Sequence, residues 1–173
     1  MNKYKWFIGV FGSLAIVLGG IFLFLLVTDI KDQQQEAENR EKAQKEFEEQ
    51  VDSIEVEAVD ADNLPTESFF QDMIHKMSHQ KVESNEKWAG HLRITPDRIA
   101  EMQAVLLKIE GTSKEYENYD FYEKTLTSWG RGDFENAVEV HNTIWQWKGG
   151  NVGRATGLLN AEEEQEYIKR YFD

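Results

Sequence analysis

The chain has 173 residues, no cysteine and a formal net charge of −13 at pH 7. The lack of cysteine excludes a disulfide framework and thiolate metal sites. All 32 acidic residues follow residue 28, so the bulk of the chain repels nucleic acid, and we expect no nucleic-acid partner.

Residues 6–27 form an apolar run without a charged residue. As a helix rising about 1.5 Å per residue, the run would extend about 33 Å, close to the thickness of the hydrocarbon core of a bilayer. A cleaved secretory signal is the alternative, but it has a shorter apolar region and an A-x-A-like site, which this run lacks. We therefore predict an N-terminal tail and an uncleaved single-pass membrane anchor over residues 1–28.

Two lysines, Lys3 and Lys5, precede the apolar run. Positive charges beside a membrane segment favour the cytoplasmic side. Basic residues also follow the run, but long domains cross membranes largely regardless of charge. We expect a protein of the cell membrane whose C-terminal domain is extracytoplasmic.

Three small residues lie on one side of the predicted membrane helix: Gly12, Ala15 and Gly19. Small residues at this spacing let two helices approach closely. Glycine is frequent in membrane helices in any case. The pattern leaves a homodimer through this face open.

Residues 29–64 are strongly acidic and contain few large apolar side chains. Four apolar residues recur at helical spacing: Ala43, Phe47, Val51 and Ile54. This indicates a stalk that continues the membrane helix, with a partly disordered linker as the alternative and a hinge over residues 55–63. Because the stalk has so little apolar surface to bury, we expect the domain to fold without it.

Residues 65–173 are long enough for one hydrophobic core. Their helical periodicity and capping residues predict an all-α domain, a small bundle of about five helices without a convincing strand. The predicted helices begin near Thr66, Thr95, Ser113, Asp133 and Asn160.

Two histidines, His75 and His79, stand four residues apart, a spacing that can hold a metal ion on one helix face. That face lies opposite the apolar residues of the same helix, and Asp72 is the one further ligand in view. Zinc sites use three or four protein ligands. We therefore predict a solvated surface here, with no metal site and no cofactor.

Unusual side chains gather between Trp129 and Gly157, where three of the five tryptophans accompany a glycine-rich loop. One interpretation is a groove that binds a ligand or a partner; the other is that the aromatic residues fill the core. For His141, on the apolar stripe of its helix, we favour a hydrogen-bonded core position. The candidate binding residues are Trp129, His141, Asn142, Trp145 and Arg154.

The run WGRGDFENAVEVHNTIWQWKGGNVGRATGLLNAEEEQEYI resembles the C-terminal domain of an uncharacterised family of single-pass membrane proteins of Bacillus-type Gram-positive bacteria. The resemblance covers about the last third of the chain. It implies a domain that faces outside the cell, and it supplies no catalytic residues.

No set of catalytic residues converges in the sequence, which favours a non-catalytic interaction or regulatory module with a protein partner in the cell envelope. A cell-envelope glycan hydrolase is one alternative, because glycosidases need two carboxyl groups. Glu139 would be one of them, but a second is missing. A solute-binding domain built around the same tryptophan-rich region is the other alternative.

Overall fold

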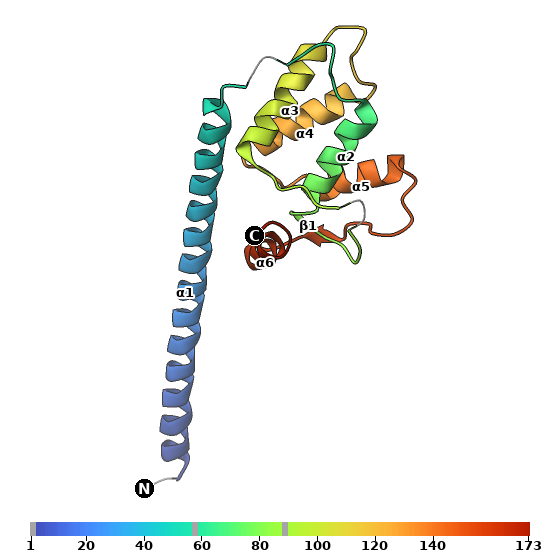
Figure 1. Ribbon diagram of the computed structural model, residues 1–173. Helices are drawn as coiled ribbons and strands as arrows, with labels where there is room; N and C mark the ends of the chain where they lie inside the picture. Colours follow the sequence, from blue (N-terminus) through green and yellow to red (C-terminus); the bar gives the residue numbers. More distant parts are fainter. Residues whose placement is uncertain (1–2, 57–58, 88–89) are drawn as a thin grey trace. The chain divides into compact units, whose positions relative to one another are not determined.

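The computed structural model describes the backbone of residues 3–56, 59–87 and 90–173, and their side chains from residue 25 onward except those of residues 32 and 36. The chain divides into two compact units, Met1–Ala43 and Gln44–Asp173. Helix α1 (Lys3–Ser53) belongs to both units (Figure 1).

The predicted membrane anchor lies within α1. Its side chains up to residue 24 lie outside the described residues, and so does the face formed by Gly12, Ala15 and Gly19. Among the residues that the structure describes, no helix has both the length and the apolar character that crossing a bilayer requires. The anchor, the homodimer and the extracytoplasmic location therefore stay predictions.

The second unit is mainly helical, as the sequence predicts. After the end of α1 it contains α2 (Glu67–Ser78), α3 (Pro96–Ile109), α4 (Tyr119–Gly130), α5 (Ala137–Trp147) and α6 (Ala161–Tyr171). Helix α2 packs on α5, and α3 packs on α4 (Figure 1).

The prediction of no strand is wrong in one place. Two short strands, β1 (Val82–Glu83) and β2 (Gly157–Leu158), pair antiparallel, with Val82 opposite Leu158. The pairing ties the chain just after α2 to the end of the glycine-rich loop that follows α5.

Three predicted helix starts are confirmed by their caps. The side chain of Thr66 accepts from the backbone N–H of Phe69, and that of Thr95 accepts from the backbone N–H of Arg98. Asn160 forms a reciprocal capping box with Glu163. Each cap satisfies backbone donors that have no partner within the helix.

Helix α4 begins at Tyr119 rather than near Ser113 because a neighbouring helix caps it. The carboxylate of Glu67, in α2, accepts from the backbone N–H groups of Glu117 at 2.9 Å and Asn118 at 3.0 Å, and from the hydroxyl of Tyr122 at 2.7 Å. Burial acts to raise the pKa of Glu67, but these hydrogen bonds lower it below its usual value. An anion is thereby fixed at the positive end of α4.

Helix α5 begins at Ala137, so the predicted start at Asp133 is wrong. The Asp133 carboxylate accepts from the backbone N–H of Glu135, within a turn that precedes the helix. At the N-cap position, Asn136 uses its side-chain oxygen to accept from the indole N–H of Trp129, at 2.8 Å. A tertiary hydrogen bond has taken the place of a local cap.

The end of α1 is part of the domain core. Val51 is 6% exposed and belongs to the main hydrophobic cluster. Phe47 packs edge-on against Phe134 with ring centres 5.9 Å apart. The helical interpretation of the stalk is therefore confirmed as far as Ser53. We expected the domain to fold without the stalk because the stalk has little apolar surface to bury. Val51 and Phe47 of the stalk nevertheless pack in the core, so that reason does not apply to the end of α1.

We predict that Val51→Ala lowers the free energy of unfolding of the full chain by about 1–3 kcal/mol, because two buried methyl groups are lost. Denaturant unfolding in detergent measures the change. Asp52→Ala, at the exposed neighbouring position of the same helix, is the matched control, with a change within about 0.5 kcal/mol. Equal effects of the two substitutions would contradict a core position for Val51.

Candidate metal centre

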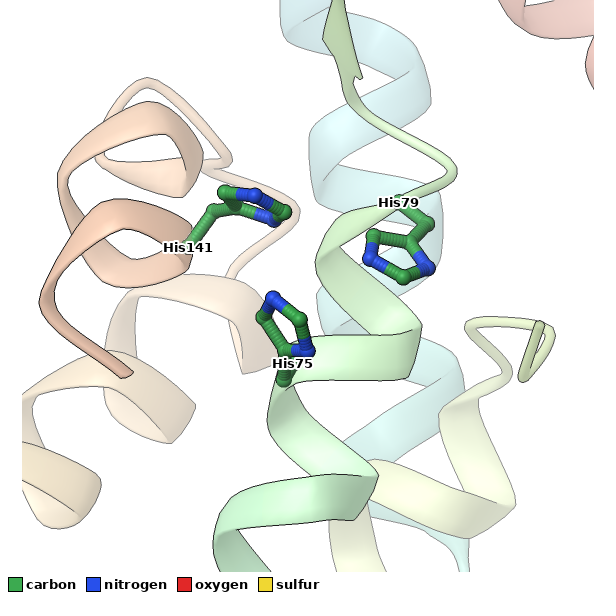
Figure 2. A group of neighbouring side chains, drawn as sticks. All are labelled: His75, His79 and His141. Carbon is green, nitrogen blue, oxygen red and sulfur yellow. The ribbon is translucent and has the colours of Figure 1, made fainter. Parts of the chain in front are cut away.

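Three histidine rings meet in the interior of the domain. His75 comes from α2, His79 is the C-cap residue that follows α2, and His141 comes from α5 and faces them (Figure 2). The ring centre of His75 lies 4.7 Å from that of His79 and 4.5 Å from that of His141, and the His79 and His141 centres are 5.3 Å apart. We call this group the three-histidine centre.

The prediction that His75 and His79 lie on a solvated surface is wrong, since their residues are 1% and 0% exposed. Helix α2 is buried on two sides. Phe70, Ile74 and Met77 form its apolar face, and its polar face packs on α5 rather than facing water. The sequence pattern counted histidine as a surface residue, which is why it placed this face outside.

The His79 ring has one engaged nitrogen and one without a partner. Its Nδ1 lies 2.9 Å from the backbone oxygen of Gly90. A carbonyl oxygen only accepts, so Nδ1 carries the proton and Nε2 has a lone pair. Among the described residues, no group forms a hydrogen bond with this buried Nε2. Such an orphaned acceptor costs free energy unless something binds it.

The tautomer of His141 is set by the same kind of contact. Its Nε2 lies 2.9 Å from the backbone oxygen of Gly153 and therefore donates to it. The Nδ1 lone pair lies 3.1 Å from the hydroxyl of Ser78. That hydroxyl has a single proton and a closer acceptor in the His75 carbonyl, at 2.6 Å. The Nδ1 of His141 is thus available to a ligand.

Burial disfavours the charged form of all three rings. Burial, and then the proximity of His141, lower the pKa of His75 to about 3. Burial and then His75 lower the pKa of His79 to about 3, against the opposing effect of the Gly90 hydrogen bond. Burial also lowers the pKa of His141, although its bond to Gly153 acts in the other direction. Neutral imidazole is the form that binds metal ions.

The spacing of the rings suits a single metal ion. Each of the three residues offers one ligand atom, and these atoms all lie within 4.8 Å of one another. With a zinc–nitrogen bond of about 2.0–2.1 Å, two imidazoles at a tetrahedral angle place their ring centres roughly 5 Å apart. Backbone carbonyls that orient ligand rings are the usual second shell of a metal site.

His141 is the third member of the group, and the sequence did not connect it with the other two histidines. It lies far along the chain from the His75–His79 pair, and no spacing rule connects them. Asp72, the ligand that the sequence did suggest, forms an ion pair with Lys148 at 2.7 Å instead. The one available signal was the i, i+4 histidine pair itself.

Three of the five candidate binding residues hold the glycine-rich loop against α5. His141 bonds to Gly153, the Asn142 side chain bonds to both backbone groups of Ala155, and Trp145 Nε1 donates to the Val152 carbonyl at 2.6 Å. Gly150 is required for this packing. A Cβ at Gly150 would come within 2.3 Å of the Trp145 ring.

The other two candidates lie apart from that arrangement. Trp129 is fully buried and belongs to the core, as the alternative interpretation held, whereas Arg154 is exposed. Glu139, the carboxylate considered for glycan hydrolysis, is exposed on α5. The structure therefore brings His141, Asn142 and Trp145 together as loop contacts, and ligand or partner binding by the five residues stays a prediction.

Comparison with known proteins gives one match. A family described as a family of unknown function, DUF6241, matches residues 74–169, a segment that includes all three histidines. No curated protein and no solved structure matches the chain.

We predict that His141→Leu lowers the free energy of unfolding of the metal-free chain by about 1–3 kcal/mol, because it leaves the buried Gly153 carbonyl without a donor. His141→Gln is the matched control, since its amide N–H can reach the same carbonyl, and it should cost less. Thermal unfolding with a chelator present makes the comparison. An unfolding midpoint for the leucine variant at or above that of the wild type would refute the structural role of His141.

Proposed function

The chain belongs to DUF6241, a family of unknown function, and we propose that it is a membrane-tethered module whose extracytoplasmic domain binds one transition-metal ion through His75, His79 and His141. The observation that carries the proposal is the convergence of three buried imidazoles whose ligand atoms all lie within 4.8 Å of one another. The metal would stabilise a non-catalytic domain that recognises a protein partner in the envelope.

Zinc is the ion that the donor set favours. Imidazole ligands suit zinc, copper, iron and nickel, whereas magnesium and calcium require oxygen. The chain has no cysteine to select a softer ion. Zinc also tolerates the coordination that the protein imposes, because its filled d shell adds no geometric preference.

Binding at this position would raise the stability of the fold. An ion that binds the native state and not the unfolded chain stabilises it by RT ln(1 + [L]/Kd), about 2.7 kcal/mol at one hundred times Kd. The ion would also give the His79 Nε2 lone pair its missing partner. Metal availability would thereby regulate how much folded domain the membrane displays.

We predict that zinc raises the unfolding midpoint of the full chain in detergent, with one ion bound per chain. His79→Asn and His141→Gln should remove this increase. In His79→Asn the side-chain amide can still donate to the Gly90 carbonyl, as His79 Nδ1 does, and in His141→Gln the amide can still donate to the Gly153 carbonyl, as His141 Nε2 does. Each substitution removes the other ring nitrogen, which is the one that would bind the metal. Calorimetric unfolding and metal analysis after gel filtration are the measurements.

The control for these variants is Asp72→Asn, which changes a carboxylate on the same helix outside the three-histidine centre. It should retain the full zinc-dependent increase. The metal proposal is refuted if zinc leaves the wild-type midpoint unchanged, or if the two histidine variants respond as the wild type does.

The tether is supported by the uncharged run at residues 6–27 and by the lysines before it. We predict that protease added to wall-stripped cells removes the domain beyond residue 64, as detected by an antibody against the C-terminus. A cytoplasmic protein probed in the same cells is the control for intactness. Protection of the domain until the cells are lysed would reverse the assigned orientation.

A further inference from the structure

Ser78 is a buried polar residue beside the three-histidine centre. It is 0% exposed and is the last residue of α2. At 3.6 residues per turn, its side chain leaves the helix within the same sector of about 100° as those of His75 and His79. Helix α2 packs on α5, and across that contact the Ser78 hydroxyl lies 3.1 Å from Nδ1 of His141. A hydroxyl is thus placed beside the nitrogen that is available to a ligand.

The position of the hydroxyl proton leaves two lone pairs facing each other. The Ser78 hydroxyl donates to the His75 carbonyl at 2.6 Å. The bond to the Gly153 carbonyl places the His141 proton on Nε2, so Nδ1 has only a lone pair. The Ser78 Oγ therefore turns a lone pair, and not its proton, toward this nitrogen. Two buried acceptors in such a contact are stabilised by a cation that both can bind.

The separation of these two atoms is close to that of two ligands on one metal ion. With zinc–nitrogen and zinc–oxygen bonds of about 2.0–2.2 Å, two ligand atoms at a tetrahedral angle lie roughly 3.3–3.5 Å apart. The observed 3.1 Å between Ser78 Oγ and His141 Nδ1 therefore requires only a small adjustment. Donation to the His75 carbonyl also polarises the hydroxyl, which makes its oxygen a stronger electron donor.

We propose that the Ser78 hydroxyl is the fourth ligand of the metal centre and completes a site of three nitrogens and one oxygen; this inference rests on the proposed function. A structural zinc ion is held by four ligands in a tetrahedron. With His75, His79 and His141 as three of them, a water molecule is the competing fourth ligand. Water is disfavoured because Ser78 and the three histidines are 1% exposed or less. The serine oxygen already lies in this packed interior, close to the required distance from Nδ1.

The first test asks whether the full-length wild type binds a water molecule on the metal. The metal-free chain is loaded with cobalt(II) in water enriched in the magnetic isotope of oxygen, so a trapped water molecule would carry the isotope. Pulsed electron paramagnetic resonance detects the hyperfine coupling between the ion and a bound oxygen of this kind. A serine oxygen does not exchange with water, so we expect no coupling. Coupling in the wild type would overturn the fourth ligand.

Two substitutions give the second test. Ser78→Cys places a thiol at the same position, and a thiolate on cobalt(II) gives a charge-transfer band in the near ultraviolet. The wild type lacks such a band because the chain has no cysteine. Ser78→Ala removes the ligand, and we expect the zinc affinity, measured by competition with a chromogenic chelator, to fall at least about tenfold. A cobalt complex of Ser78→Cys without the band, or an unchanged zinc affinity in Ser78→Ala, would refute the proposal.

Ser53→Ala is the matched control. The Ser53 hydroxyl makes the same bond to the carbonyl three residues before it, at the exposed end of α1, so the same substitution there should leave zinc affinity unchanged. Failure of the proposed function gives a different result, because zinc binding would then be absent from the wild type or retained in His79→Asn. Failure of the fourth ligand alone leaves the wild type able to bind zinc and Ser78→Ala able to bind it equally well.

Discussion

The packing of α2 against α5 through three imidazole rings is the contact on which the rest of the domain depends. A polar ring can be buried at low cost only where its nitrogens find partners. The rings therefore require particular backbone carbonyls, Gly90 for His79 and Gly153 for His141. Those two carbonyls fix the segments on either side of the β1–β2 pairing. The polar groups of the core thus determine where the loops go.

Helix α2 carries a second polar contact at its other end. Glu67, in its first turn, caps the start of α4 and bonds to Tyr122. Between this carboxylate and the histidines, Phe70 and Ile74 fill the core. One short helix therefore sets the position of α4 at its beginning and of α5 at its end. Without α2, both α4 and α5 would lose the contacts that position them.

Local signals predicted much of the fold, and tertiary contacts account for what they missed. Thr66, Thr95 and Asn160 cap their helices with their own side chains, so the sequence alone located those starts. The starts of α4 and α5 depend on Glu67 and on the Trp129–Asn136 bond, which join residues that no periodicity relates. The three-histidine centre was missed for the same reason. Periodicity predicts that a helix face with polar residues is exposed. It predicts exposure for a face with two histidines as well, because it contains no information about a second helix that covers that face.

The complete burial of the three rings has a kinetic consequence. In the part of the chain that the structure describes, the three residues are 1% exposed or less, so an ion held among them would leave through local opening of the packing around the rings. Its residence time would then be set by the frequency of local opening in the domain, and not by the strength of its bonds alone. Such a centre would respond slowly to the surrounding metal concentration. The fraction of chains with a bound ion would then depend on the metal concentration at the time of folding rather than on the concentration later.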